Sequence, residues 1–243
     1  VVAIDIRGGA NIAQVDVRDH VMLSDACRGS QALVHLAGLD YDTPSALRQR
    51  IEVNVLGTAT VLEVCRELDI GKVVICSSVA ALGLHERRSD WPPQELPITD
   101  HHERRPVEDY SVSKAMVELL ARAAGEALPS LLCIRPVAIV FPGQEENFVD
   151  EMLNEVHSLR DFVAAEDVAS AIQCYLQLAH SGFDCVTLAA DESVTDIPTL
   201  EWFARQFPNF EGAMDLEYFR QRPFAALYSN DRAKHLLGWR PQI

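Results

Sequence analysis

The sequence lacks a long apolar run and a surplus of positive charge. Arg135 interrupts the longest apolar stretch, so no segment approaches the roughly 18 residues of a membrane-spanning helix. The formal net charge is -15 at pH 7, from 21 Lys and Arg against 36 Asp and Glu. Nucleic acids and anionic membranes attract clustered positive charge, so the sequence predicts neither as a partner.

The sequence also lacks any Cys-x-x-Cys pair. Its six cysteines fall mostly inside apolar segments: Cys27, Cys65, Cys76, Cys133, Cys174 and Cys185. This pattern predicts reduced, buried thiols in a cytoplasmic protein, and no metal site.

Glycine is scarce, with 12 in 243 residues, and no Gly-x-x-Gly-x-x-Gly occurs anywhere. The length is sufficient for one sizeable core and an appended lobe. We therefore expect one main domain with an appended lobe.

A buried strand is predicted at residues 73 to 76. Val73, Val74, Ile75 and Cys76 form a short apolar run rich in β-branched side chains, and Ser77-Ser78 ends it. Such runs are typical of strands buried on both faces of a parallel sheet. Ligands of open α/β sheets bind just beyond the carboxyl ends of the strands, so we expect Ser77 and Ser78 at the mouth of a site.

A helix is predicted from Tyr110 onward. Its expected apolar face consists of Met116, Val117, Leu119, Leu120 and Ala124, and its expected solvent face of Glu118 and Arg122. Tyr110 and Lys114 are four residues apart, so their side chains leave the same face of this helix one turn apart.

The Tyr110–Lys114 pair has a chemical use. A phenol ordinarily has a pKa of about 10, and lowering it to about 7 takes roughly 4 kcal/mol. An ammonium about 5 Å away supplies roughly 3 kcal/mol at an effective dielectric of about 20. A Tyr-x-x-x-Lys pair alone arises by chance in about one such chain in sixteen, so whether it marks a functional site depends on the residues around it.

That context is a Ser-Ser strand end some thirty residues upstream, followed by Val-Ala-Ala-Leu-Gly83, and His35-Leu-Ala-Gly38 at the end of another apolar strand. Together these features resemble the extended short-chain dehydrogenase/reductase family of NAD-dependent epimerases and dehydratases. The resemblance implies an α/β fold, a doubly wound, Rossmann-like parallel sheet with a small C-terminal substrate lobe. It implies a dinucleotide-binding domain over 1–140, completed by about 161–190, and a substrate-binding lobe over 141–160 and 191–243.

The family begins with a strand, a glycine-rich turn and a helix, and this sequence has none of them ahead of Val1. Because that first strand lies centrally in the family's sheet, a molecule without it would expose strand edges and apolar core. We therefore expect that the natural polypeptide contains residues that this sequence omits.

Asp5 closes a short apolar strand, where an acid can bind the adenosine ribose hydroxyls or stand solvated. A carboxylate there repels a 2′-phosphate, so NAD is favoured over NADP, although Arg7 lies two residues on. Asp16 is either a helix-capping residue or, by resemblance, an adenine contact with Val17. The residues that the resemblance assigns to the cofactor are Asp5, Ile6, Arg7, Asp16, Val17, Leu36, Ala37, Gly38, Asn54, Cys76, Tyr110, Lys114, Pro136 and Val137.

Two of the polar residues nearby have structural interpretations. His35 is expected to be a packed or hydrogen-bonded histidine without a catalytic role. Asn54 lies in a helix predicted from Val53 to Leu68, and the resemblance implies that it supports the active-site helix and Lys114.

The resemblance implies that Tyr110 is the catalytic base, that Ser78 hydrogen-bonds the same substrate oxygen, and that Lys114 acidifies the phenol and binds the nicotinamide ribose. The predicted substrate-binding residues are Ser78, Val79, Ala80, Tyr110, Ala138, Asn147, Arg160 and Arg222. Ala138 replaces an asparagine that usually binds the diphosphate of nucleotide sugars, and Arg222 lacks the usual Gly-Asp after it.

Three functions stay open, and a nucleotide-sugar epimerase is the leading prediction among them. A nucleotide-sugar epimerase is favoured by Asn147 and Arg160, and a sugar or sugar-acid (uronate-type) dehydrogenase by Ala138. The third is an NAD-binding regulator without turnover, against which Ser78, Tyr110 and Lys114 argue. The expected partners are a sugar nucleotide or sugar acid and a second copy of the chain, paired through helices 52–68 and 110–128.

Overall fold

The computed structural model describes residues 1–84, 91–144, 148 and 159–242. The chain forms two compact units. The first comprises Val1–Ser77, Val107–Ile134 and Ala179–Asp184, and the second Ser78–Pro106, Arg135–Leu178 and Cys185–Ile243.

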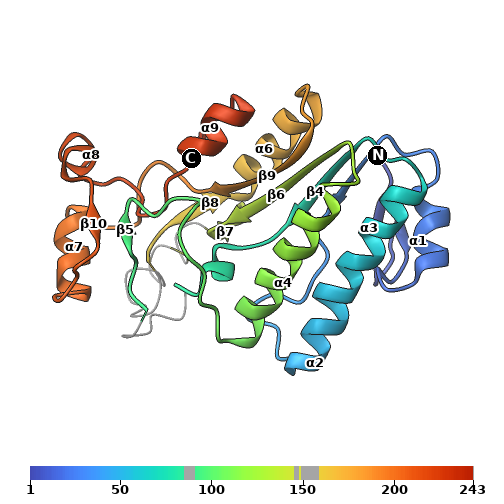
Figure 1. The fold of residues 1–243 in the computed structure, drawn as a ribbon, viewed down its shortest axis with the longest axis horizontal. Helices are drawn as coiled ribbons and strands as arrows, with labels where there is room; N and C mark the ends of the chain where they lie inside the picture. The colour runs from blue at the N-terminus through green and yellow to red at the C-terminus, as the bar shows by residue number, and fades with distance from the viewer. Residues whose placement is uncertain (85–90, 145–147, 149–158, 243) are drawn as a thin grey trace. The chain divides into compact units, whose positions relative to one another are not determined.

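The main sheet has four strands in the order β3-β4-β6-β9. They are β3 (Ala32–His35), β4 (Lys72–Cys76), β6 (Ser130–Pro136) and β9 (Gly182–Leu188). β4 pairs in parallel with β3 on one side and β6 on the other, with Val73 opposite Leu33 and Leu131. Val73, Val74 and Ile75 are fully buried, which confirms the buried strand predicted from their apolar run. The parallel sheet with covering helices confirms the α/β fold class (Figure 1).

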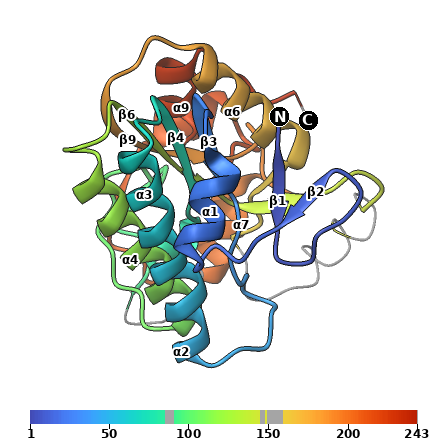
Figure 2. The same ribbon diagram turned by 90° about the vertical axis from the view of Figure 1, so that its right-hand side faces the viewer.

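The first two strands stand apart from this sheet. β1 (Ala3–Asp5) and β2 (Ile12–Gln14) pair in parallel as a separate two-stranded sheet (Figure 2). β3 is consequently an edge strand of the main sheet, and Val34 and Leu36 are 37% and 59% exposed.

Five helical segments complete the first unit. They are α1 (His20–Cys27), α2 (Leu47–Arg50), the π-helical η1 (Ile51–Leu56), α3 (Gly57–Glu67) and α4 (Asp109–Ala124). Asp19 caps α1 by accepting a hydrogen bond from the backbone N–H of Met22 at 3.0 Å. The helix predicted from Val53 in fact begins at Leu47, because the wide η1 turn continues α2 into α3. The sequence carries no signal for a π turn.

The buried and exposed residues of α4 differ in part from those predicted. Glu118, assigned above to the solvent face, is 1% exposed, whereas Leu119 of the expected apolar face is 59% exposed. Val117 is buried as predicted, at 1% exposure. The Glu118 assignment was wrong because this carboxylate has a buried hydrogen-bond donor, the Ser77 hydroxyl, at 2.8 Å.

The second unit contains short strands and helices. They are η2 (Val79–Leu82), β5 (Glu95–Leu96), β7 (Ala138–Val140), β8 (Phe162–Ala164), α6 (Ala165–Gln177), α7 (Thr199–Gln206), β10 (Ala213–Met214), α8 (Leu216–Gln221) and α9 (Asp231–Leu237). β5 pairs in parallel with β10, and β7 with β8. Asp161 is buried there, and burial raises its pKa to about 6 despite hydrogen bonds from Ser193 and the backbone N–H of Tyr228.

All six cysteines are unpaired, and Cys27, Cys65 and Cys133 are buried, in agreement with the prediction of reduced thiols. None of the helices in the described part of the chain combines the length and apolarity that crossing a bilayer requires.

His35 is buried and joins β3 to α3. Its Nε2 lies 3.0 Å from Thr58 Oγ1, and the Thr58 hydroxyl donates to the Asn54 carbonyl at 2.6 Å. Because the hydroxyl proton is used in that bond, the imidazole must donate through Nε2. Burial, and then the positive charge of Lys114, lower the pKa of His35 to about 4, so it is neutral. This confirms the expected structural histidine.

A pH-dependent contribution to stability follows from His35. Its pKa falls from 6.5 to about 4 on folding, so its stabilisation is present above pH 6.5 and is lost as the pH falls toward 4. Between about pH 7 and about pH 5 the loss amounts to about 2 kcal/mol. Urea unfolding at both pH values should show that His35→Gln loses less stability on acidification than the wild type. Equal losses in the two proteins would contradict this origin, since Asp161 and all other groups titrate in both.

Candidate active site

Tyr110 and Lys114 lie one turn apart on α4, as their spacing predicts. Lys114 Nζ is 5.7 Å from the centroid of the Tyr110 ring. Tyr110 is half-buried, and its hydroxyl makes no hydrogen bond to any residue that the structure describes. The phenol oxygen is therefore available to a ligand, with a cation beside its ring.

The side chain of Lys114 is held in one position. Lys114 is 7% exposed, and its Nζ donates to the carbonyl oxygen of Cys76, the last residue of β4, at 2.9 Å. A Cβ added at Gly38 would lie 3.8 Å from Nζ and 3.1 Å from Asn54 Oδ1. The backbone after β3 thus passes close to the lysine, at a position where a side chain would be crowded.

Asn54 connects that backbone to α4. Its Oδ1 accepts from the Leu39 N–H at 2.7 Å, and its Nδ2 donates to the Leu39 carbonyl and to Ser113 Oγ, both at 3.0 Å. Ser113 precedes Lys114 on α4, so Asn54 contacts the helix directly, as its expected supporting role requires.

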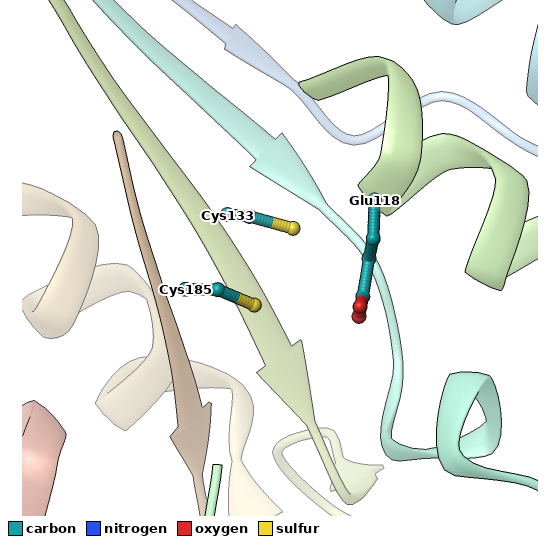
Figure 3. A group of neighbouring side chains, drawn as sticks. All are labelled: Glu118, Cys133 and Cys185. Carbon is teal, nitrogen blue, oxygen red and sulfur yellow. The ribbon is translucent and has the colours of Figure 1, made fainter. Parts of the chain in front are cut away.

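Glu118 gives α4 a second attachment to the end of β4. The Ser77 hydroxyl donates to Glu118 Oε1 at 2.8 Å, and both residues are buried. Cys133 Sγ of β6 lies within 4.8 Å of a Glu118 carboxylate oxygen (Figure 3). Tyr110, Lys114 and Glu118 follow one another at four-residue intervals, so this spacing could have revealed Glu118 as part of the inward face.

Ser78 is the first residue of the second unit. It is the N-cap of η2, where its hydroxyl accepts from the Ala80 N–H at 3.1 Å. Val79 and Ala80 are buried in the same turn. Gly83 ends the turn at φ +77°, and a Cβ there would lie 2.5 Å from the Arg105 carbonyl oxygen. The turn after Ser78 therefore requires glycine at this position, while the convergence of Ser78 with Tyr110 stays a prediction.

The predicted adenosine contacts lie on the surface of the first unit. Asp5 is exposed at the end of β1, and its carboxylate accepts from the Arg7 N–H at 2.8 Å. Asp16 forms a close ion pair with Arg18, whose hydrogen bond lowers the pKa of the carboxyl. Ile6, Leu36 and Ala37 are also exposed, whereas Val17 and Cys76 are half-buried.

The other predicted contacts belong to the second unit. Pro136 and Val137 are buried, and Ala138 is exposed on β7. Arg160 has φ +59° and its Cζ lies 5.1 Å from the Trp202 ring centroid. Arg222 is exposed, and its Cζ lies 4.8 Å from the centroid of the Tyr218 ring. Asn147 lies outside the described residues.

Sequence reasoning did not identify two further residues around Tyr110. The Arg50 guanidinium carbon lies 5.5 Å from the Tyr110 ring centroid, and the Tyr41 ring approaches it edge-on at 6.1 Å. Both are some sixty residues from Tyr110 in the chain and match no motif, so no local signal could have found them.

Comparisons with known proteins place these observations in a family. The model of the "NAD dependent epimerase/dehydratase family" matches residues 2–184. The chain is 26% identical over 203 residues to 3beta-hydroxysteroid-dehydrogenase/decarboxylase isoform 2 of Arabidopsis thaliana, covering 76% of this chain and 34% of that protein. It is 29% identical over 144 residues to N-acetyl-alpha-D-glucosaminyl-diphospho-ditrans,octacis-undecaprenol 4-epimerase of Escherichia coli O157:H7, covering 58% of this chain and 40% of that protein.

The fold is similar to that of MoeE5 in complex with UDP-glucuronic acid and NAD. The TM-score is 0.71 at 18% identity, and the match covers 99% of this chain and 85% of that one. This chain thus spans about a third to two fifths of the two curated relatives described above, and most of the solved structure. Because the family model covers residues 2–184, more than half of the sequence, the chain belongs to the NAD dependent epimerase/dehydratase family.

Proposed function

We propose that this chain oxidises a sugar carbinol with NAD as its cofactor and that the overall reaction is the epimerisation of a nucleotide sugar. The observation that carries the proposal is the Tyr110–Lys114 pair. The lysine is tied to the Cys76 carbonyl and its Nζ lies 5.7 Å from the phenol ring centroid. A fixed cation beside a phenol favours the phenolate, which can act as a base.

In this proposal Tyr110 takes the carbinol proton at its phenol oxygen. Lys114 stabilises the phenolate form of Tyr110 that accepts this proton, and it would also hydrogen-bond the nicotinamide ribose. Ser78 donates a hydrogen bond to the substrate oxygen, which orients it for deprotonation. Val79 and Ala80, which follow Ser78, shape the substrate contact.

The residues present fit two parts of NAD. The crowded approach of Gly38 to Asn54 and Lys114 suits a backbone that lies against the nicotinamide ribose, with Leu36, Ala37, Cys76, Pro136 and Val137 as further contacts. The exposed Asp5 suits the adenosine ribose, and Ile6, Arg7, Asp16 and Val17 its surroundings. When bound, NAD supplies a hydride acceptor.

Some observations support a nucleotide sugar as the substrate, and others argue against it. The Escherichia coli relative is a 4-epimerase, and MoeE5 was crystallised with UDP-glucuronic acid. Arg160 and Arg222 offer positive charge for a diphosphate. Against this, Ala138 cannot hydrogen-bond a diphosphate through its side chain, and the Arabidopsis relative is named a dehydrogenase. Oxidation of a sugar or sugar acid without return of the hydride is therefore the second candidate.

We also propose a homodimer through helices 52–68 and 110–128. Leu56, Met116 and Leu119 on these segments are 54%, 36% and 59% exposed, and apolar area of this kind supports association. The cytoplasmic location and the regulator without turnover stay untested.

Replacing Tyr110 by Phe should lower turnover roughly a hundredfold to ten-thousandfold, because the ring remains and only the proton acceptor is lost. Steady-state rates measure the effect, and titration of NAD checks that cofactor binding is retained. Tyr41→Phe is the matched control, since it also removes one hydroxyl beside the same ring and should leave turnover near wild type. Near-normal turnover of Tyr110→Phe would refute the assigned base.

Replacing Asp5 by Ser should weaken NAD binding about tenfold or more, because a hydrogen bond to a charged group is lost. NADP binding should weaken less, since the carboxylate also repels the 2′-phosphate. Fluorescence titration with both dinucleotides measures the two affinities, and Asp42→Ser, at another exposed loop position, serves as the control. An unchanged NAD-to-NADP preference would remove Asp5 from the ribose site.

The two candidate reactions differ in what accumulates. With NAD and a panel of UDP-galactose, UDP-glucuronate and free glucuronate, an epimerase converts the sugar while bulk NADH absorbance stays flat. A dehydrogenase produces one NADH for each sugar oxidised. Stoichiometric NADH would overturn the epimerase, and conversion to the epimer without NADH would overturn the dehydrogenase.

A further inference from the structure

Arg50 is a buried cation without a carboxylate partner. It ends α2 and is 5% exposed. Its guanidinium donates to the carbonyl oxygens of Asp40, of Tyr41 at 3.2 Å and of Thr43 at 3.0 Å, and its Nε has no hydrogen-bond partner. Among the residues that the structure describes, it forms no ion pair. A buried charge that only carbonyl dipoles solvate is costly unless an anion can form nearby.

The phenol of Tyr110 is an ionisable group close to that charge. The guanidinium carbon lies 5.5 Å from the Tyr110 ring centroid, almost the same distance as Lys114 Nζ at 5.7 Å. Two buried cations therefore face one phenol, one from α2 and one from its own helix. Both cations are almost entirely shielded from solvent, so dissolved salt screens neither of them effectively.

The other charged or titratable groups around α4 do not replace this interaction. Asp40 caps Thr43, Glu52 of η1 pairs with Arg48, and His35 of β3 is neutral. Besides Tyr110, the charged or titratable residues on the 40–43 loop, α2, η1 and the first turns of α4 with its N-cap are Asp40, Tyr41, Asp42, Arg48, Arg50, Glu52, Glu108, Asp109 and Lys114.

We propose that Arg50 is a positioning residue that, together with Lys114, stabilises the phenolate of Tyr110 and holds the 40–43 loop against its ring. The proposal rests on the assignment of Tyr110 as the base. The loop contact follows from the three carbonyl bonds and from the edge-on approach of Tyr41 at 6.1 Å. No motif marks position 50, so the second cation is a feature of this chain's own packing.

Tyrosinate absorbance in the ultraviolet tests the proposal directly in the full chain without substrate. Subtracting the titration of the matching Tyr110→Phe protein isolates Tyr110 from Tyr41 and the other tyrosines. In Arg50→Met the Tyr110 titration midpoint should rise by about one pH unit, because an opposite charge at this distance shifts an ionisation by that order. Arg50→Lys keeps the charge and should stay within about a third of a unit of wild type.

Arg48→Met is the matched control, because Arg48 lies on the same helix but is exposed and paired with Glu52. Its midpoint should not move. Arg50→Gln provides a second neutral variant that can still donate to a loop carbonyl, should the methionine protein not fold. The acid limb of the kcat/KM profile should move with the absorbance midpoint in each variant.

An unmoved Tyr110 midpoint in both neutral variants would overturn the proposal. A higher KM with an unmoved midpoint would also overturn it and would assign Arg50 to substrate binding instead. If Tyr110→Phe retains turnover, the base assignment fails by itself. If Tyr110→Phe is inactive while Arg50→Met behaves like Arg48→Met, only the role of Arg50 fails.

Discussion

The attachment of α4 to the end of β4 is the constraint on which the candidate site depends. Two hydrogen bonds make it: Lys114 Nζ to the Cys76 carbonyl at 2.9 Å, and the Ser77 hydroxyl to Glu118 at 2.8 Å. They lie one helical turn apart on α4 and at successive residues on the strand. A strand end held at two points cannot slide along the helix, so the carboxyl end of β4 and the Tyr110 phenol keep a fixed spacing.

The local parts of this arrangement could be read from the sequence. The apolar run before Ser77 predicts β4, and the four-residue spacing predicts that Tyr110 and Lys114 share a face of α4. The same spacing extends to Glu118, but hydropathy favoured solvent for a carboxylate. The buried Ser77 hydroxyl, contributed by another element, helps to make burial of that charge tolerable. Leu119 illustrates the reverse case, since it is apolar by type and exposed by position.

The contacts between residues far apart in the chain could not be predicted from the sequence pattern. The approach of Arg50 to Tyr110 depends on the path of α2 and on the π turn of η1, and neither has a sequence signature. The resemblance alone suggested that Asn54 supports α4, because a helical asparagine is otherwise an ordinary surface choice, and it did not predict the direct hydrogen bond to Ser113.

The buried charged residues of the first unit bear on the ionisation of Tyr110. Lys114 and Arg50 bring two positive charges to the phenol, and the positive charge of Lys114 helps to keep His35 neutral. Glu118 is the buried anion on the same helix, but its carboxylate accepts from Ser77 at the strand end, a full turn beyond Lys114. The two buried cations beside Tyr110 therefore favour a negative charge on the phenol or on a ligand beside it. A site biased in this way favours removal of a proton from a neutral hydroxyl, and that is the first step any carbinol oxidation requires.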